Sequence, residues 1–275
     1  MLSLFQRDVT VAVLGSGSGG NCTYVGDGRA GVLIDCGIST KQILARMESV
    51  GLKGAPINAV LVTHEHSDHV GSAGVLSRKL KKLTGEWVPT YMTEGTAAHT
   101  PDSSLPDGPL CQIEAGVPFR VRHFLVDPFT IPHDVQDPVA YRLEIGGASV
   151  AVVTDLGRPT QLVTRKIRDL DALVLEFNHD VEMLLGGRYP WRVKQRIRSS
   201  HGHLSNDQAA DLLAEGWTPR LKNLVLAHLS DENNAPARAI AAASRTLSGL
   251  GADTTIKVAQ QSEALPPISV SASGW

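Results

Sequence analysis

Thr63-His64-Glu65-His66-Ser67-Asp68-His69 follows the apolar run Ala59–Val62 and precedes a segment with helical spacing. Ligand-type side chains are costly to bury without a partner, and this stretch carries four of them within six residues. Side chains alternate along a strand, so His64 and His66 point to one side, while the later ligands begin a helix and face a second position. The stretch therefore predicts a site for two metals. A histidine-rich polar loop is the competing interpretation.

More ligand-type residues stand at the carboxyl ends of apolar runs, where open α/β sheets place their sites. His133 follows a strand-like run, and Asp155 and His228 each end one. Asp155 is the natural bridge, because one carboxylate offers an oxygen to each of two cations. Asp35 ends another apolar run and can orient a ligand histidine from behind. A lone histidine at a strand end is more often structural, so the prediction depends on all of these residues occurring together.

Composition limits the cellular setting. The 275 residues are 42% hydrophobic and 20% charged, which is enough apolar material for a sizeable core. The net charge of −2 means that nucleic acid must be bound through a local patch, if at all. Three cysteines without a CxxC pair, no secretion signal and no apolar run of about 20 residues predict a cytoplasmic protein outside the membrane. The oligomeric state stays open.

Short apolar segments alternate with helical ones, which predicts one mixed α/β domain over residues 1–260 and a loosely held tail over 261–275. The predicted strands are Val9–Leu14, Gly31–Asp35, Ala59–Thr63, Val88–Tyr91, Phe119–Val126, Ala140–Ile145, Ser149–Thr154, Ala172–Glu176, Leu221–Ala227 and Thr254–Val258. The predicted helices are Thr40–Val50, Asp68–Leu83, Asn206–Ala214 and Pro236–Leu247.

The metal-ligand candidates occur along nearly the whole chain in an order that resembles the five-motif series of the metallo-β-lactamase superfamily. That order is Asp35, then His64-x-His66-x-Asp68-His69, His133, Asp155 and His228. The resemblance implies an α/β fold, a four-layer αββα sandwich with the metals at one edge of its two sheets. It also implies two divalent metal ions, and imidazole and carboxylate ligands suit Zn²⁺ or Mn²⁺. By this resemblance, one ion takes His64, His66 and His133, the other takes Asp68, His69 and His228, and Asp155 bridges them.

Longer stretches resemble the YycJ-type (WalJ) branch of bacterial nucleases, proposed 5′-to-3′ DNA exonucleases. They include LGSGSGGNCTYV near the start, THEHSDHVGS, the run Glu176–Asp180, Gly202–Asn206 and Ala227–Asn234. Close alternatives fit less well. An exported β-lactamase would usually carry a signal peptide, and a flavodiiron protein would replace a ligand and add a flavin domain. The inserted domain of the β-CASP group does not fit into the 73 positions between Asp155 and His228.

The predicted reaction is attack on a phosphodiester by a hydroxide shared between the two metals, with Asp68 orienting that hydroxide. His179 and His203 are candidates for the acid that protonates the leaving oxygen, because general acids are commonly histidine. A buried structural role explains His179 equally well.

Two segments are candidates for contacts with substrate. The loop Gly15–Asn21 offers amides and hydroxyls that would hold a phosphate, although a flexible turn is the alternative. The run Arg188–Arg198 mixes basic and aromatic residues, which suits backbone neutralisation and base stacking, and a solvated helix face is the alternative. The predicted substrate-binding residues in these segments and in the nuclease-like motifs are Ser16, Ser18, Asn21, Asn178, Arg192, Lys194, Ser205 and Asn206.

The sequence thus predicts a dinuclear, metal-dependent DNA exonuclease. Hydrolysis of a small ester or cyclic phosphodiester, or the processing of RNA, are alternative enzyme functions, because one scaffold supports many chemistries. A silent metal-bound interaction protein is the non-enzyme alternative, and the intact Asp68 and Asp155 argue against it.

Overall fold

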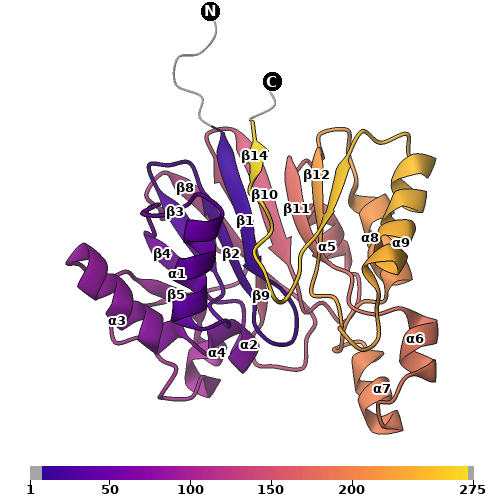
Figure 1. Cartoon of the computed structure of the whole chain (residues 1–275), viewed down its shortest axis with the longest axis horizontal. Coiled ribbons are helices and arrows are strands. Elements are labelled where there is room, and N and C mark those ends of the chain that lie inside the picture. The colour runs from indigo at the N-terminus through magenta and orange to yellow at the C-terminus, as the bar shows by residue number, and fades with distance from the viewer. Residues whose placement is uncertain (1–7, 272–275) are drawn as a thin grey trace, which may run out of the picture.

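The computed structural model describes residues 8–271, which form two seven-stranded sheets packed face to face (Figure 1). The first sheet has, in spatial order, β14 (Ile268–Val270), β1 (Val9–Gly15), β2 (Cys22–Gly26), β3 (Gly31–Ile34), β4 (Ala59–Leu61), β5 (Thr90–Thr93) and β6 (Leu110–Ile113). The second has β13 (Thr255–Val258), β12 (Asn223–Ala227), β11 (Ala172–Glu176), β10 (Ala148–Val153), β9 (Val139–Ile145), β8 (Phe124–Thr130) and β7 (Phe119–Val121).

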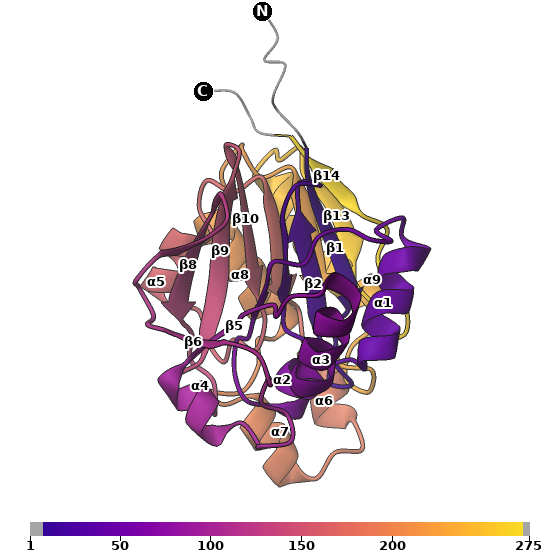
Figure 2. The ribbon, with the colours of Figure 1, turned by 90° about the vertical axis from the view of Figure 1, so that its left-hand side faces the viewer.

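Helices lie outside both sheets, so the layers follow the predicted order αββα, which is confirmed (Figure 2). On the side of the first sheet are α1 (Thr40–Ser49), α2 (Ser67–Val70), α3 (Ala73–Thr84) and α4 (Glu94–His99). With the second sheet are α5 (Gln161–Lys166), α6 (Val181–Gly186), α7 (Trp191–Ile197), α8 (Asn206–Gly216) and α9 (Pro236–Gly249). Within residues 8–271, no helix is long and apolar enough to cross a membrane.

Three apolar clusters fill the spaces between the layers. One lies between the two sheets and includes Val32 and Val174, while the other two join each sheet to its helices. Strands β3, β10 and β11 are buried along their whole length. Burial on both faces explains why these strands have nearly uninterrupted apolar side chains instead of alternating with polar ones.

The parallel parts of the two sheets determine where functional side chains gather. Strands β3 to β6 are parallel to one another, and so are β10 to β13. Because the carboxyl ends of parallel strands meet at one edge of a sheet, the residues that follow β3, β4, β10, β11 and β12 come together.

Two predicted elements were wrong in their extent. The predicted strand Phe119–Val126 is a hairpin, because the chain turns at Arg122 (φ 55°) and β7 pairs antiparallel with β8. The predicted helix Asp68–Leu83 is split into α2 and α3, because the Ser72 N–H donates to the Cys36 carbonyl and not to its own preceding turn. Strands β2, β6 and β14 and the short helices α4 to α7 were not predicted.

The C-terminal segment is held more firmly than predicted. Residues 268–270 form β14, which pairs antiparallel with β1. The Leu265 N–H donates to the Val13 carbonyl at 2.8 Å. The prediction of a loosely held tail is therefore wrong for residues 265–270, whereas residues 272–275 lie outside the described part of the chain.

Candidate metal centre

The seven predicted ligands come together at one end of the sandwich. The ligand nitrogens of His64, His66 and His133 lie within 4.8 Å of one another. The same holds for one ligand atom each of Asp68, His69 and His228. These residues follow β4, β8 and β12 or lie in α2, so segments far apart in the sequence supply one cluster.

Asp155, two residues after the end of β10, lies between the two groups. Its Oδ2 is 2.9 Å from His69 Nε2. Its Oδ1 is 3.8 Å from His133 Nε2 and 3.7 Å from His228 Nδ1. One buried carboxylate thus faces ligands of both groups, as expected of a bridging residue.

The donor atoms suit a divalent cation. His66 Nδ1 lies 3.1 Å from His64 Nε2 and 3.4 Å from His133 Nε2. Three ring nitrogens therefore converge on one point, where a metal ion could accept their lone pairs. Asp155 Oδ2 and His228 Nε2 are buried without a hydrogen-bond partner. Unpaired buried polar atoms are costly, and a metal ion would satisfy both of them.

Charge is balanced inside the cluster. Burial raises the pKa of a carboxyl group, yet the His228 and His69 imidazoles hold the pKa of Asp155 well below its usual value. Burial lowers the pKa of an imidazole, but the surrounding carboxylates, Asp155 foremost, raise the pKa of His228 to about 10. In contrast, burial lowers the pKa of His64 well below its usual value.

Asp35 orients His69 from behind, in the position predicted for it. Asp35 Oδ2 lies 2.8 Å from His69 Nδ1, and its Oδ1 accepts the Thr63 N–H at 2.8 Å. This contact places the ring proton on Nδ1 and leaves Nε2 to face the cluster.

Glu176, at the end of β11, was not assigned a role from the sequence. It is fully buried, and its Oε2 accepts the Asp155 N–H at 2.5 Å while its Oε1 accepts the Leu204 N–H at 2.7 Å. Oε2 also lies 3.4 Å from His203 Nδ1 and 3.5 Å from His228 Nδ1. Burial would raise the pKa of Glu176, but His203 and His228 outweigh it and hold the pKa at about 2. The available signal in the sequence was the place of Glu176 at the end of the predicted strand Ala172–Glu176, as Asp155 and His228 stand at the ends of theirs.

Three strand-end residues of the centre have a left-handed backbone. The φ angles are 62° at Asp35, 56° at Asp155 and 54° at His228. L-residues other than glycine rarely adopt this conformation, because Cβ approaches the following carbonyl oxygen. At each of these three residues the backbone bends sharply at the end of a strand, and the side chain joins the cluster.

The glycine-rich loop is not a free phosphate cradle, which corrects that interpretation. Ser16 Oγ accepts the His228 N–H at 2.7 Å, and Asn21 Nδ2 lies 3.0 Å from His69 Nε2. The loop amides of Ser16, Gly17, Gly19, Gly20 and Asn21 donate to protein oxygens. The loop therefore supports the ligands. Ser18 is exposed and is the one predicted contact of this loop still open to solvent.

Asn178, Ser205 and Asn206 are also used within the protein. Asn178 Nδ2 donates to the His228 carbonyl at 3.0 Å, and Ser205 Oγ accepts the Gln208 N–H that begins α8. Asn206 Nδ2 donates to Asn234 Oδ1 at 2.9 Å. All three side chains are buried, which corrects their assignment to substrate.

The two predicted acids lie in different surroundings. His203 Nδ1 is 3.6 Å from Asp155 Oδ1, and its side chain is 21% exposed. Burial would lower the pKa of His203, but Glu176 outweighs it and raises the pKa. His179 is 1% exposed, its Nδ1 has no hydrogen-bond partner, and burial lowers its pKa to about 4. His203, not His179, belongs to the rim of the cluster.

The basic run forms α7, and its charges differ in use. Lys194 is buried, and its Nζ donates to the Leu185 and Gly187 carbonyls at 2.7 and 2.6 Å. The prediction that Lys194 contacts substrate is therefore wrong, because its ammonium fastens α7 to α6. Arg192 is exposed and remains available.

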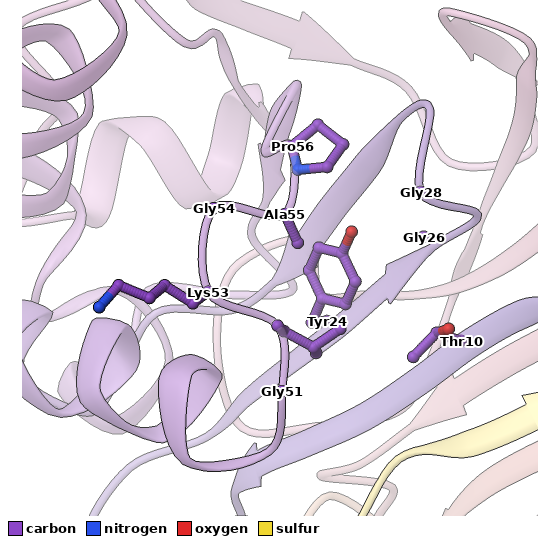
Figure 3. Close-up of a pocket in the computed structure, with 10 residues that line it drawn as sticks. Thr10, Tyr24, Gly26, Gly28, Gly51, Lys53, Gly54, Ala55 and Pro56 are labelled. Atoms are coloured by element: carbon purple, nitrogen blue, oxygen red, sulfur yellow. The ribbon is translucent and has the colours of Figure 1, made fainter.

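A crevice of about 320 Å³ lies elsewhere, between β2 and the loop over residues 51–56 (Figure 3). The Tyr24 ring faces this loop. The lining includes Thr10, several glycines and Lys53, whose ammonium pairs with Glu48 at 2.6 Å. This lining has no cluster of ligand-type or nucleophilic side chains, so the chemistry belongs to the metal centre.

The chain matches the beta-lactamase superfamily domain over residues 31–228. The exodeoxyribonuclease YycJ of Bacillus anthracis is 37% identical over 225 residues, covering 81% of this chain and 83% of that protein. The exodeoxyribonuclease WalJ of Streptococcus pneumoniae is 34% identical over 225 residues, covering 81% and 82%. Among solved structures, the metallo-β-lactamase fold protein YhfI of Bacillus subtilis has a TM-score of 0.69 at 18% identity, covering 94% and 99%, which is a likeness of fold. The chain therefore belongs to the metallo-β-lactamase superfamily, in the branch of the YycJ and WalJ exodeoxyribonucleases.

Proposed function

We propose that this protein is a dinuclear metal-dependent phosphodiesterase that degrades DNA as an exonuclease in the 5′-to-3′ direction. The observation that carries the proposal is the pair of ligand groups with Asp155 between them. The names of the two curated relatives support DNA as the substrate and exonuclease action as the mode. Direction of digestion is the part of the proposal that rests on resemblance alone.

In this proposal two divalent cations, Zn²⁺ or Mn²⁺, are bound by the two groups of ligands described above, and Asp155 serves both. Such cations activate water and stabilise charge on a phosphate oxygen. Asp35, Ser16 and Glu176 hold the ligands in place from behind, because each bonds a ligand side chain or its backbone.

Asp68 orients the attacking water, and His203 protonates the leaving oxygen. The Asp68 side chain is 22% exposed, whereas that of Asp155 is 3% exposed, so Asp68 is the carboxylate that an attacking water can reach. Asp68 accepts a hydrogen bond from this water and orients it toward phosphorus. His203 is fixed at Nδ1 by Glu176, and its second nitrogen donates a proton to the leaving oxygen.

The decisive experiment compares substrates with metal-replete protein. DNA labelled at the 5′ end, single-stranded and double-stranded, is incubated with wild type, Asp68→Ala and the control Asp207→Ala, whose side chain is 76% exposed on α8. We expect labelled mononucleotides from wild type and Asp207→Ala, and none from Asp68→Ala. DNA labelled at the 3′ end should instead give a ladder of shortening fragments.

Other results would assign the centre differently. Cleavage of RNA but not DNA would indicate an RNA nuclease. Turnover of bis(p-nitrophenyl) phosphate without cleavage of either polymer would indicate a small-diester hydrolase. Inertness toward all of these substrates would contradict the enzyme proposal.

A further inference from the structure

Helix α7 lies beside the metal centre. Both views show it at the end of the sandwich where α2 lies (Figures 1 and 2). The Ile197 carbonyl at its last turn accepts the His203 N–H at 2.8 Å. The Arg196 guanidinium pairs with Asp134, the residue next to His133. The end of α7 thus forms part of the wall of the cluster.

Two positively charged side chains attach α7 to its neighbours. Lys194 bonds two carbonyls of the α6 end, and Arg196 bonds the loop that carries His133. These side chains use their charges for attachment inside the protein. The helix is therefore attached at two points, and Trp191, Arg192, Val193 and Gln195 are exposed on it.

The first turn of α7 exposes a large aromatic side chain. Trp191 is 59% exposed, the highest fraction among the exposed large hydrophobic residues of the described chain. Arg198 follows seven residues later, so the two lie on one side of α7, about 10 Å apart along its axis. Within residues 8–271, Arg192 and Arg198 form no ion pair, unlike Arg188 and Arg196.

We propose that Trp191 stacks on an unpaired base of the substrate strand, while Arg198, nearer the metal centre, and Arg192, next to Trp191, neutralise phosphates of the same strand. A base offers its face to an aromatic ring only when it is not stacked in a duplex, so the occupant is a single strand at this point. This inference rests on the proposed function and specifies its substrate.

The charges favour nucleic acid as the occupant. An exposed tryptophan also suits a protein interface, but Arg192 next to it and Arg198 at the other end of α7 give this face two positive charges without an ion pair within residues 8–271, which favours an anionic partner. The C-terminal end of α7, with Arg198, lies next to His203 and the loop of His133, so a strand held along α7 would lead toward the metal centre.

The test measures binding separately from cleavage. A fluorescein-labelled oligothymidine of 20 nucleotides is titrated, with Mn²⁺ present, against the Asp68→Ala protein and against the same protein carrying Trp191→Ala, Trp191→Phe or Trp87→Ala. Trp87 is the matched control, because it is 40% exposed and near α3. Fluorescence anisotropy gives each Kd.

We expect Trp191→Ala to weaken binding roughly 5- to 150-fold, the range for one base–aromatic stack. Phenylalanine should restore most of the affinity, because its ring also offers a face. Trp87→Ala should bind as the parent does, and a blunt duplex should show no dependence on Trp191.

Unchanged binding by Trp191→Ala would overturn the inference and would leave an anionic protein as the partner of this face. An equal loss with Trp87→Ala or with the blunt duplex would overturn it as well. The proposed function fails separately: wild type would then not cleave DNA, although binding still depended on Trp191. Cleavage by wild type with Trp191-independent binding would refute this inference alone.

Discussion

Replacing Glu176 by glutamine tests whether this carboxylate holds the strand ends of the metal centre together. Its two oxygens accept the N–H groups of Asp155 and Leu204, and glutamine can accept from only one of them. A buried amide left unpaired costs about 1–3 kcal/mol, and the loss of charge on the remaining bond adds about 1 kcal/mol. We therefore expect a loss of about 2–4 kcal/mol, which lowers the Tm by about 4–16 °C in a chain of this size.

The assay is thermal unfolding of metal-free wild type and Glu176→Gln, followed by circular dichroism at pH 7. Glu182→Gln is the control, because that side chain is 85% exposed and its one ion pair within residues 8–271 is with Arg238 on the surface. Exposed pairs contribute at most about 1 kcal/mol, so the control should melt close to wild type. A Tm for Glu176→Gln within about 2 °C of wild type would refute the reasoning, because the expected cost is larger than that.

Further predictions concern ligand orientation, metal loading and the support of α7. Asp35→Asn keeps one acceptor oxygen and no charge, so it cannot serve both the Thr63 N–H and His69 Nδ1 as the carboxylate does; we expect metal affinity to fall about 10–100-fold in a chelator competition assay, and equal affinity would contradict this role. Removing metal from protein loaded at 100 times Kd should cost about 2.7 kcal/mol of stability, seen as a lower Tm with EDTA; an unchanged Tm would mean that the centre binds no cation. Lys194→Met should make residues 186–198 more sensitive to chymotrypsin than Arg192→Met does, because only Lys194 fastens α7 to α6. Equal sensitivity of the two variants would show that α7 is held by other contacts.

The ligands could be predicted because their signal is local and repeated. A polar residue of ligand type directly after a buried strand is unusual, and parallel strands bring such positions to one edge. Asp35, Asp155 and His228 all follow this rule. Glu176 follows it too, at the end of β11, but a glutamate within an otherwise family-like run gave no separate indication that it bonds its neighbours.

The substrate contacts were harder to predict, because a sequence shows which groups are present and not which are already paired. The loop around Ser16 and Asn21 is rich in donors, yet the fold directs them toward His228 and His69. Lys194 counts as a positive charge in the sequence, yet its ammonium bonds two carbonyls. Whether a polar group faces solvent depends on tertiary packing, which periodicity and composition do not contain.

The three left-handed turns at Asp35, Asp155 and His228 have a consequence for engineering. A residue with a β-carbon costs about 1–2 kcal/mol in such a turn, less for aspartate than for histidine, and glycine relieves that cost. At position 228 glycine would relieve this cost, but it would also remove a metal ligand that faces Asp155 and Glu176. The stability that bound metal contributes, about 2.7 kcal/mol at 100 times Kd, is larger than the cost of the turn. Selection for heat resistance with metal present should therefore keep histidine at this position despite its left-handed backbone.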